Sequence, residues 1–339
     1  MPPSLIDVNE TLERVPLALG ASGDAVAELH AALTLAGYLV ETVHLDRFEE
    51  QTHDAVVAFQ RRRGMEPTGV VDEETWESLD EAGHHFGERL LCRRTPMMRG
   101  DDVAELQFML GSLGFDAGWI DGIFGADTEL AVADFQRNAG LPVDGVAGPT
   151  TCATLTRLRL SANAARPVAA VRERDLLRNG RPGLVGRRVV VGDLGVSPTA
   201  AGAVGAALRR EGARVLLLHH PNGSTHARAA NQFDAELYLG VELTDSDNCQ
   251  ALFYETDTFS SYGGRHLAGL AMDNLSLALR VPGSVAGSRA AVLRETRMPA
   301  VLFRIGPPGR LSSQQHRFTD GLLRALHTWV AEPSPEDAD

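Results

Sequence analysis

The chain contains one motif twice: SGDAVAEL at residues 22–29 and RGDDVAEL at residues 99–106, an offset of 77. A second pair follows at an offset of 76, with AVVAFQR at residues 55–61 and AVADFQR at residues 131–137. The two offsets differ by one residue, as a loop insertion between the motifs would produce. Because self-similarity at a fixed spacing marks a repeated structural unit, we predict two copies of one small domain in the first half of the chain.

Each copy has the pattern of three short helices. In the first copy, a second helix is expected at about residues 49–63, and Asp72 is the expected N-cap of the third helix. In the second copy, Pro149 stands where the third helix should begin, a position at which its missing N–H is not needed. We therefore predict two all-α three-helix domains, at residues 16–82 and 93–158.

From Gly186 onward the pattern alternates between apolar strands and helices. Strands are expected at residues 188–191, 213–218, 236–243, 251–254 and 300–305, and helices at residues 198–211, 226–233, 263–279 and 314–330. This order predicts an α/β domain at residues 186–330, with a largely parallel sheet flanked by helices. The connecting residues 159–185 are rich in Ala, Arg and Pro and are predicted to be a linker that is partly helical.

Composition limits the classes of function. The chain has 339 residues and a net charge of −13, which argues against binding to nucleic acid or to an anionic membrane. No apolar stretch is long enough to span a bilayer, and the first ten residues lack the features of a signal peptide. The three cysteines lack metal-ligand spacing and are expected to be reduced. We therefore expect a cytoplasmic protein without a transmembrane segment.

The two repeats resemble the three-helix peptidoglycan-binding domain. Its motifs recur in the second copy as DGIFG at residues 121–125 and DGVAGPTT at residues 144–151, whereas the first copy lacks the DGIFG turn. The resemblance implies binding of a glycan or a peptide, with Trp119, Asp121 and Phe124 as candidate ligand-binding residues. The alternative is that these side chains pack the three helices together.

The third domain resembles the zinc-dependent N-acetylmuramoyl-L-alanine amidases, which cut the amide between N-acetylmuramic acid and L-alanine. The likeness includes GARV at residues 212–215, RAAN at residues 228–231 and MPAVLFRIG at residues 298–306. In that family the first strand leads to a zinc-binding histidine, and the loop after it leads to a glutamate ligand. The third strand ends in a second histidine ligand, and the last strand carries the catalytic glutamate.

These catalytic positions are changed in this chain. No histidine lies between the first strand and His219, the loop is nearly deleted, and Asp193 is the residue nearest to the acidic ligand. Glu242 stands at the second histidine and Arg304 at the catalytic glutamate. Two carboxylates and a guanidinium do not supply the ligands and general base of a zinc hydrolase. We therefore expect no catalytic residue, metal or other cofactor, and we predict an ion pair between Glu242 and Arg304.

Three histidines form a second candidate metal cluster: His219, His220 and His226. Imidazole is a common ligand of zinc and nickel. However, the turn PNGS at residues 221–224 separates them, and the flanking residues supply no fourth ligand. We interpret the three as exposed loop histidines.

The order of the domains resembles the cytoplasmic pseudo-amidases of the CwlM type in actinobacteria, which are linked to control of an early enzyme of peptidoglycan precursor synthesis. The resemblance implies a protein partner in that pathway, and a peptidoglycan precursor or muropeptide as a candidate ligand. Two alternatives stay open. One is an active zinc amidase of peptidoglycan turnover whose ligands are other residues, and the other is a module that anchors a protein to peptidoglycan.

Overall fold

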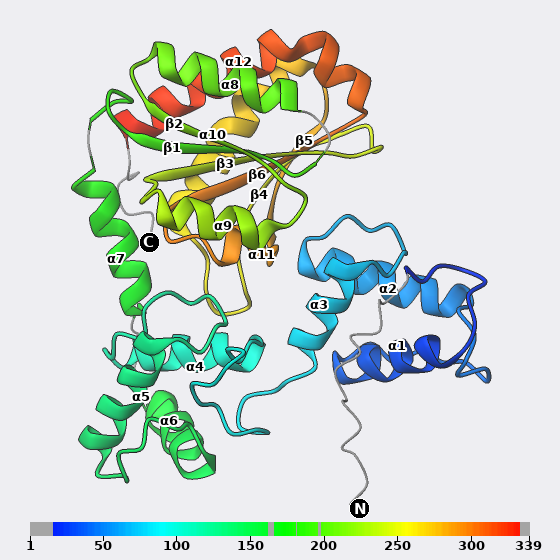
Figure 1. The fold of residues 1–339 in the computed structure, drawn as a ribbon, viewed down its shortest axis with the longest axis vertical. Helices are drawn as coiled ribbons and strands as arrows, with labels where there is room; N and C mark the ends of the chain where they lie inside the picture. The colour runs from blue at the N-terminus through cyan, green and yellow to red at the C-terminus, as the bar shows by residue number, and fades with distance from the viewer. Residues whose placement is uncertain (1–15, 162–165, 181, 196–197, 333–339) are drawn as a thin grey trace, which may run out of the picture. The chain divides into compact units, whose positions relative to one another are not determined.

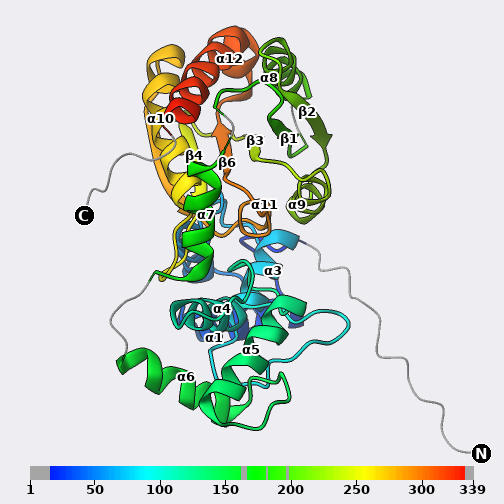
Figure 2. The same ribbon diagram turned by 90° about the vertical axis from the view of Figure 1, so that its left-hand side faces the viewer.

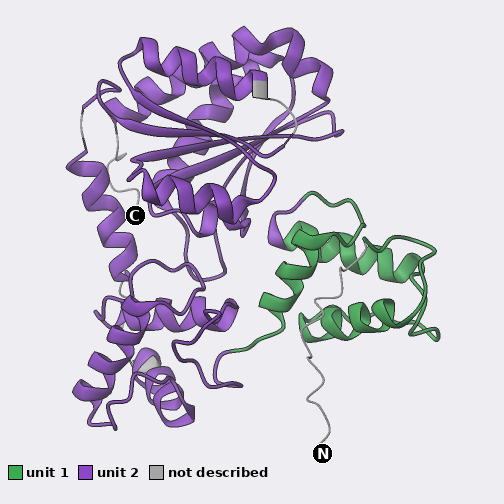
Figure 3. Ribbon diagram, in the orientation of Figure 1, with its two compact units in different colours: residues 1–62, 66–85 green, residues 63–65, 86–339 purple. Residues whose placement is uncertain are grey.

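The computed structural model describes residues 16–161, 166–180, 182–195 and 198–332. The chain divides into two compact units, shown in Figure 3, of which unit 1 holds residues 1–62 and 66–85 and unit 2 holds residues 63–65 and 86–339. The residues to which the signal-peptide prediction applies lie outside the described part. No helix of the described part is both long enough and apolar enough to cross a membrane.

Unit 1 is built on the first repeat, whose three helices form as predicted: α1 (Asp24–Leu35), α2 (Glu50–Arg63) and α3 (Glu73–Ala82). Its core consists of fully buried apolar side chains from all three helices, among them Leu29, Phe59 and Trp76. Asp72 caps α3 as expected, because its carboxylate accepts a hydrogen bond from the backbone N–H of Thr75 at 2.9 Å.

Replacing Asp72 with alanine should lower the free energy of unfolding of unit 1 by about 1 kcal/mol, because the N–H of Thr75 loses its acceptor. Urea denaturation followed by circular dichroism measures the change. Asp72→Asn is the matched control, since an asparagine oxygen caps equally well and should leave the midpoint near that of the wild type. An equal loss in both variants would contradict the capping role.

Unit 2 begins with the second repeat, formed by α4 (Asp101–Ser112), α5 (Ala126–Ala139) and α6 (Pro149–Ser161), so Pro149 is the first helical residue as predicted. The glutamine of the FQR motif explains why that motif and the DGVAG turn occur together. The Gln136 side chain accepts from the backbone N–H groups of Asp144 and Gly145 and donates to the carbonyl of Val146 at 3.0 Å. One buried amide therefore fixes the turn that leads into α6.

The remainder of unit 2 is an α/β domain with a six-stranded sheet (Figure 1). The strand order is β2-β1-β3-β6-β4-β5, and every neighbouring pair is parallel except β4 and β6. The strands are β1 (Arg188–Asp193), β2 (Arg214–His219), β3 (Leu237–Leu243), β4 (Cys249–Tyr254), β5 (Gly283–Ser288) and β6 (Ala300–Ile305). The predicted largely parallel sheet is confirmed.

Helices cover both faces of this sheet, and Figure 2 shows the two helical layers nearly edge-on. One face carries α8 (Pro198–Arg210), α10 (Tyr262–Leu279) and α12 (Pro308–Ala331), and the other carries α9 (Gly223–Gln232) and α11 (Ala291–Arg294). Alternation along each strand supplies both cores: Val189 faces the first core, whereas its neighbour Val190 faces the second.

Three details of the α/β domain differ from the sequence-based expectation. β2 was expected to be buried, but it is an edge strand whose residues are at most half-buried. β5 was not predicted, because its sequence GSVAGS has little β propensity and its position at the other edge leaves it largely exposed. The last helix begins at Pro308 and is kinked at Gln314, the residue at which the sequence predicted its start.

The segment predicted as a linker contains a helix that packs against the α/β domain. Within α7 (Val168–Arg178), Glu173 is 3% exposed. Its carboxylate accepts from the hydroxyl of Ser261 at 2.6 Å and from the backbone N–H groups of Tyr262 and Gly263, at the start of α10. Glu173 of α7 thus caps the N-terminus of α10. The segment between the second repeat and the α/β domain is therefore packed against the α/β domain and is not only a flexible connection. Residues 162–165 and 181 of the predicted linker lie outside the described part.

Candidate functional site

The carboxyl ends of β3 and β6 carry the predicted ion pair. Glu242 and Arg304 are register partners on these adjacent parallel strands. Nε of Arg304 lies 2.7 Å from Oε2 of Glu242, and the Arg304 side chain is 5% exposed. The prediction of an ion pair at the two altered catalytic positions is therefore confirmed. A buried guanidinium occupies the place in the fold where the resemblance puts a catalytic carboxylate.

Asp193, the third altered position, does not join this pair. It is the register partner of Val241, the residue before Glu242. Since successive side chains of a strand point to opposite faces, Asp193 and Glu242 leave the sheet on opposite sides. The buried Asp193 carboxylate instead binds His219 of β2, with Oδ2 2.7 Å from Nδ1. Residues 196 and 197, in the shortened loop after β1, lie outside the described part.

In the described part of the chain, the three histidines do not form a metal-binding group. His219 and His220 lie at and just after the end of β2, whereas His226 is a buried residue of α9 and not an exposed loop residue as predicted. Nδ1 of His226 lies 2.8 Å from the hydroxyl of Tyr238. Burial lowers the pKa of His226 to about 4, so its imidazole is neutral at pH 7. Burial also raises the pKa of Tyr238, so both side chains of this buried hydrogen bond are neutral at pH 7.

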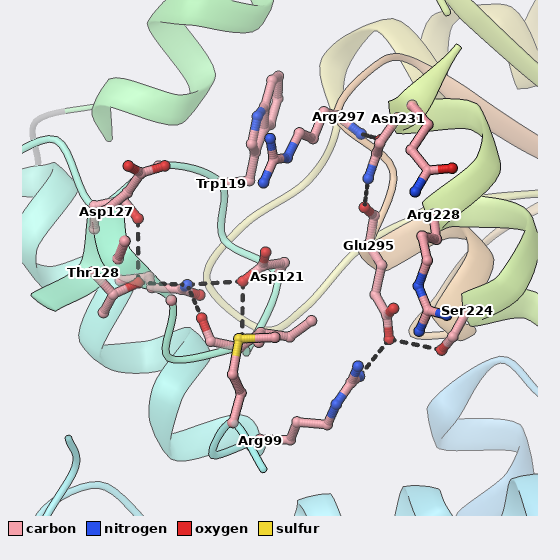
Figure 4. A pocket seen from close by; sticks show the side chains of 18 residues that line it. Arg99, Trp119, Asp121, Asp127, Thr128, Ser224, Arg228, Asn231, Glu295 and Arg297 are labelled. Carbon is pink, nitrogen blue, oxygen red and sulfur yellow. Dashed lines mark hydrogen bonds and ion pairs between the residues drawn. The ribbon is translucent and has the colours of Figure 1, made fainter. Parts of the chain in front are cut away.

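A second candidate site lies within unit 2, where the second repeat faces the α/β domain. Here a cavity of about 590 Å³ has one wall from the DGIFG region and one from α9 and the segment before β6 (Figure 4). Residues of the repeat that line it are Met97, Arg99, Gln107, Ala117, Gly118, Trp119, Asp121, Ile123, Gly125, Ala126, Asp127 and Thr128. Residues of the α/β domain that line it are Ser224, Arg228, Asn231, Gln232, Glu295 and Arg297.

Glu295 connects the two walls of this cavity. Its side chain is 9% exposed, and its carboxylate binds Nη1 of Arg99 in the repeat at 2.6 Å. The hydroxyl of Ser224 donates to the same oxygen at 3.0 Å (Figure 4). Burial opposes ionisation of Glu295, but the charges of Arg294 and Arg99 outweigh it and lower its pKa. A charged, hydrogen-bonded contact between the two domains therefore lines the cavity.

The three predicted ligand-binding residues have different environments. Trp119 is half-buried and lines the cavity. Asp121 lines it too, but its Oδ1 accepts from Nε2 of Gln107 at 2.8 Å and from the backbone N–H of Ile123, so this oxygen fixes the DGIFG turn. Phe124 is fully buried in the core of the repeat. For Phe124 the structure therefore supports the packing alternative.

Comparisons with known proteins agree with this geometry. The family described as "Putative peptidoglycan binding domain" matches residues 22–79 and 99–155. Over 91% of its length, covering 88% of the relative, the chain is 32% identical to the N-acetylmuramoyl-L-alanine amidase CwlM of Mycobacterium tuberculosis. The chain belongs to the CwlM amidase family.

Other relatives of this CwlM-family chain match smaller parts of it. It is 31% identical to the N-acetylmuramoyl-L-alanine amidase CwlL of Bacillus licheniformis, over 41% of this chain and 44% of that protein. Among solved structures, an N-acetylmuramyl-L-alanine amidase from Mycobacterium smegmatis is similar with a TM-score of 0.38 and 14% identity, covering 44% of this chain and 98% of that structure.

The zinc of the amidase family does not fit the residues that this CwlM-family chain presents. Glu242 is bound by a guanidinium, and Asp193 leaves the opposite face of the sheet bound to His219. Across the described residues, no group of three or more His, Cys, Asp and Glu is arranged to hold a metal ion. A catalytic zinc needs about three protein ligands and an open position for water.

Several residues of the cavity were not identified from the sequence. The sequence RAAN at residues 228–231 indicates only the family likeness, and no motif marks Glu295. Their position at one cavity depends on how the repeat packs against the α/β domain, which no local pattern encodes. One difference between the two repeats indicates a role for Arg99. The motif of the second repeat begins with Arg99, which binds Glu295, whereas the motif of the first repeat begins with Ser22.

Proposed function

We propose that this chain is a catalytically inactive member of its amidase family that acts by binding, as a cytoplasmic regulator in peptidoglycan biosynthesis. The observation that carries the proposal is the 2.7 Å ion pair between Arg304 and Glu242 at the carboxyl ends of β6 and β3. A guanidinium stays protonated in proteins and cannot act as a general base, and it repels a cation at the same position. The two substitutions satisfy each other, as expected for a fold retained without its metal.

Two further features support a binding role. Both repeats match a family of peptidoglycan-binding domains, and the second repeat is held against the α/β domain through Arg99, Glu295 and α7. We propose that the ligand is a peptidoglycan precursor or a muropeptide, and that the partner is a protein of precursor synthesis. Affinity capture from the native cell should then recover an enzyme of that pathway. Capture of wall-turnover proteins alone would contradict the regulatory role.

An active amidase is the second candidate, because the relatives that the chain matches carry that name. A cleavage assay separates the two proposals. Purified full-length protein, supplied with zinc, is incubated with a muropeptide beside an active zinc amidase, and release of the peptide is followed by mass spectrometry. We expect no release above the rate without protein. Turnover that a chelator abolishes would overturn the proposal of an inactive protein.

A further inference from the structure

We propose that the cavity between the second repeat and the α/β domain, here called the junction pocket, binds a sugar that carries an anionic group. This assignment rests on the proposed function, in which the chain acts by binding, and it adds the chemical class of the ligand. It assigns the ligand to a composite site that neither domain forms alone. The volume of about 590 Å³ is in the range of small-molecule sites.

The α/β wall supplies the binding groups for the anion. Arg228 of α9 and Arg297, just before β6, both line the junction pocket and are exposed. Across the described residues, neither guanidinium has an ion-pair partner, whereas Arg99 and Arg294 are both bound to Glu295. Two free arginines at one cavity favour a carboxylate or phosphate, which a guanidinium binds through paired hydrogen bonds.

The backbone at Arg297 is held in place by the same wall. Its N–H donates to Oδ1 of Asn231 at 2.9 Å, and the amide of Asn231 donates to the carbonyl of Glu295 at 2.9 Å. Figure 4 shows Asn231, a residue of α9, beside Arg297 and Glu295. The backbone at Arg297 is therefore fixed to α9, the helix that carries Arg228, which reduces the entropy cost of binding.

The repeat wall supplies a flat apolar surface and hydrogen-bonding groups. The Trp119 indole lies at the pocket, and the guanidinium carbon of Arg172 is 5.8 Å from its ring centroid. Arg172 also donates to the carbonyl of Gly118 at 3.2 Å, so α7 holds the indole in place. The C–H groups of a sugar ring can cover such an aromatic face. The exposed Asp127 carboxylate nearby can accept hydrogen bonds from hydroxyl groups.

The two domains that line the junction pocket are packed firmly against each other. Ile120, next to Trp119, is 4% exposed and packs in the apolar core that lies under α9 and α11. Together with the contact between Arg99 and Glu295, this packing fixes the repeat against the α/β domain. The anion-binding wall and the aromatic wall therefore face each other across a preformed cavity.

The test measures binding of three sugars to the full chain by saturation-transfer NMR titration, which detects weak complexes. The probes are N-acetylglucosamine, which is neutral, N-acetylmuramic acid, which adds a carboxylate, and N-acetylglucosamine 1-phosphate. We expect both anionic sugars to bind more tightly than the neutral one. The anionic sugar that binds with the higher affinity shows whether the natural ligand presents a carboxylate or a phosphate.

Three variants locate the binding. Arg228→Gln and Arg297→Gln should each weaken binding of the preferred anionic sugar about tenfold while leaving the neutral sugar unchanged, because one charge-assisted contact is lost. Trp119→Ala should weaken binding of all three sugars. Arg210→Gln, at the exposed end of α8, is the matched control and should bind like the wild type.

Equal binding of neutral and anionic sugars, binding of none, or wild-type affinity in both pocket arginine variants would overturn the junction pocket as an anionic-sugar site. These outcomes differ from failure of the proposed function. A chain that releases peptide from a muropeptide in the cleavage assay would refute inactivity and leave the junction pocket standing. An inactive chain that ignores all three sugars would refute the pocket alone.

Discussion

Replacing Glu242 with alanine is expected to lower the free energy of unfolding of the α/β domain by about 2–3 kcal/mol. The variant leaves the Arg304 guanidinium, whose side chain is 5% exposed, without the carboxylate that it binds at 2.7 Å. An uncompensated buried charge is costly, and this cost exceeds the net value of the intact pair. Urea denaturation of the full chain, followed by tryptophan fluorescence, measures the change.

Two further variants isolate this interaction. Arg304→Met should cost less than Glu242→Ala, about 1 kcal/mol, because the Glu242 side chain is 29% exposed and can be hydrated when alone. The double variant should be more stable than Glu242→Ala alone. Asp134→Ala breaks an exposed ion pair with Arg137 and should change stability by less than about 0.5 kcal/mol. If the costs of the two single substitutions add in the double variant, Glu242 and Arg304 are not coupled.

Stability should also fall below neutral pH because of His226. Its pKa is near 4 in the folded state and 6.5 in its ordinary state, so the unfolded chain binds more protons between these values. The stability that the neutral His226 imidazole contributes to the folded state is fully present above pH 6.5 and is lost as the pH falls toward 4. The shift corresponds to a loss of at most about 3 kcal/mol, because each pKa unit is worth about 1.4 kcal/mol.

Urea denaturation at pH 7 and at pH 4.5 measures this loss. Burial also lowers the pKa of His30 and His266, so part of the acid sensitivity belongs to other residues. His226→Asn should therefore be less stable than the wild type at pH 7 and show a smaller difference between the two pH values. His316→Gln changes an exposed histidine and should keep the wild-type difference. An unchanged difference in His226→Asn would contradict a neutral, buried imidazole.

Much of the architecture could be predicted because its determinants are local. The repeat motifs indicated the helices, and the alternation of apolar strands with helices indicated the parallel sheet. The ion pair between Glu242 and Arg304 was predicted because the resemblance placed both residues at adjacent strand ends. Three features required tertiary information. β5 is an edge strand with weak β propensity, His226 is buried by the packing of α9 on Tyr238, and α7 caps α10 through Glu173.

The junction pocket was the least predictable feature. Trp119 and Asp121 were identified from their motif, but their opposite wall comes from residues more than 100 positions away in the sequence. For Asp193 the sequence predicted a position that the structure does not confirm. Its place in the sequence, nearest to the acidic ligand of the family, predicted that it lies at the altered site. The two-residue period of β1 then directs its side chain to the other face of the sheet.

Zinc stoichiometry of the purified full chain tests the central claim most directly. The protein is incubated with excess zinc, freed of unbound metal by gel filtration, and analysed by native mass spectrometry beside an active zinc amidase. With Arg304 bound to Glu242 and Asp193 on the opposite face, we predict less than one-tenth of a zinc ion per chain. About one zinc ion per chain, retained by the wild type and lost in Glu242→Ala, would contradict the account.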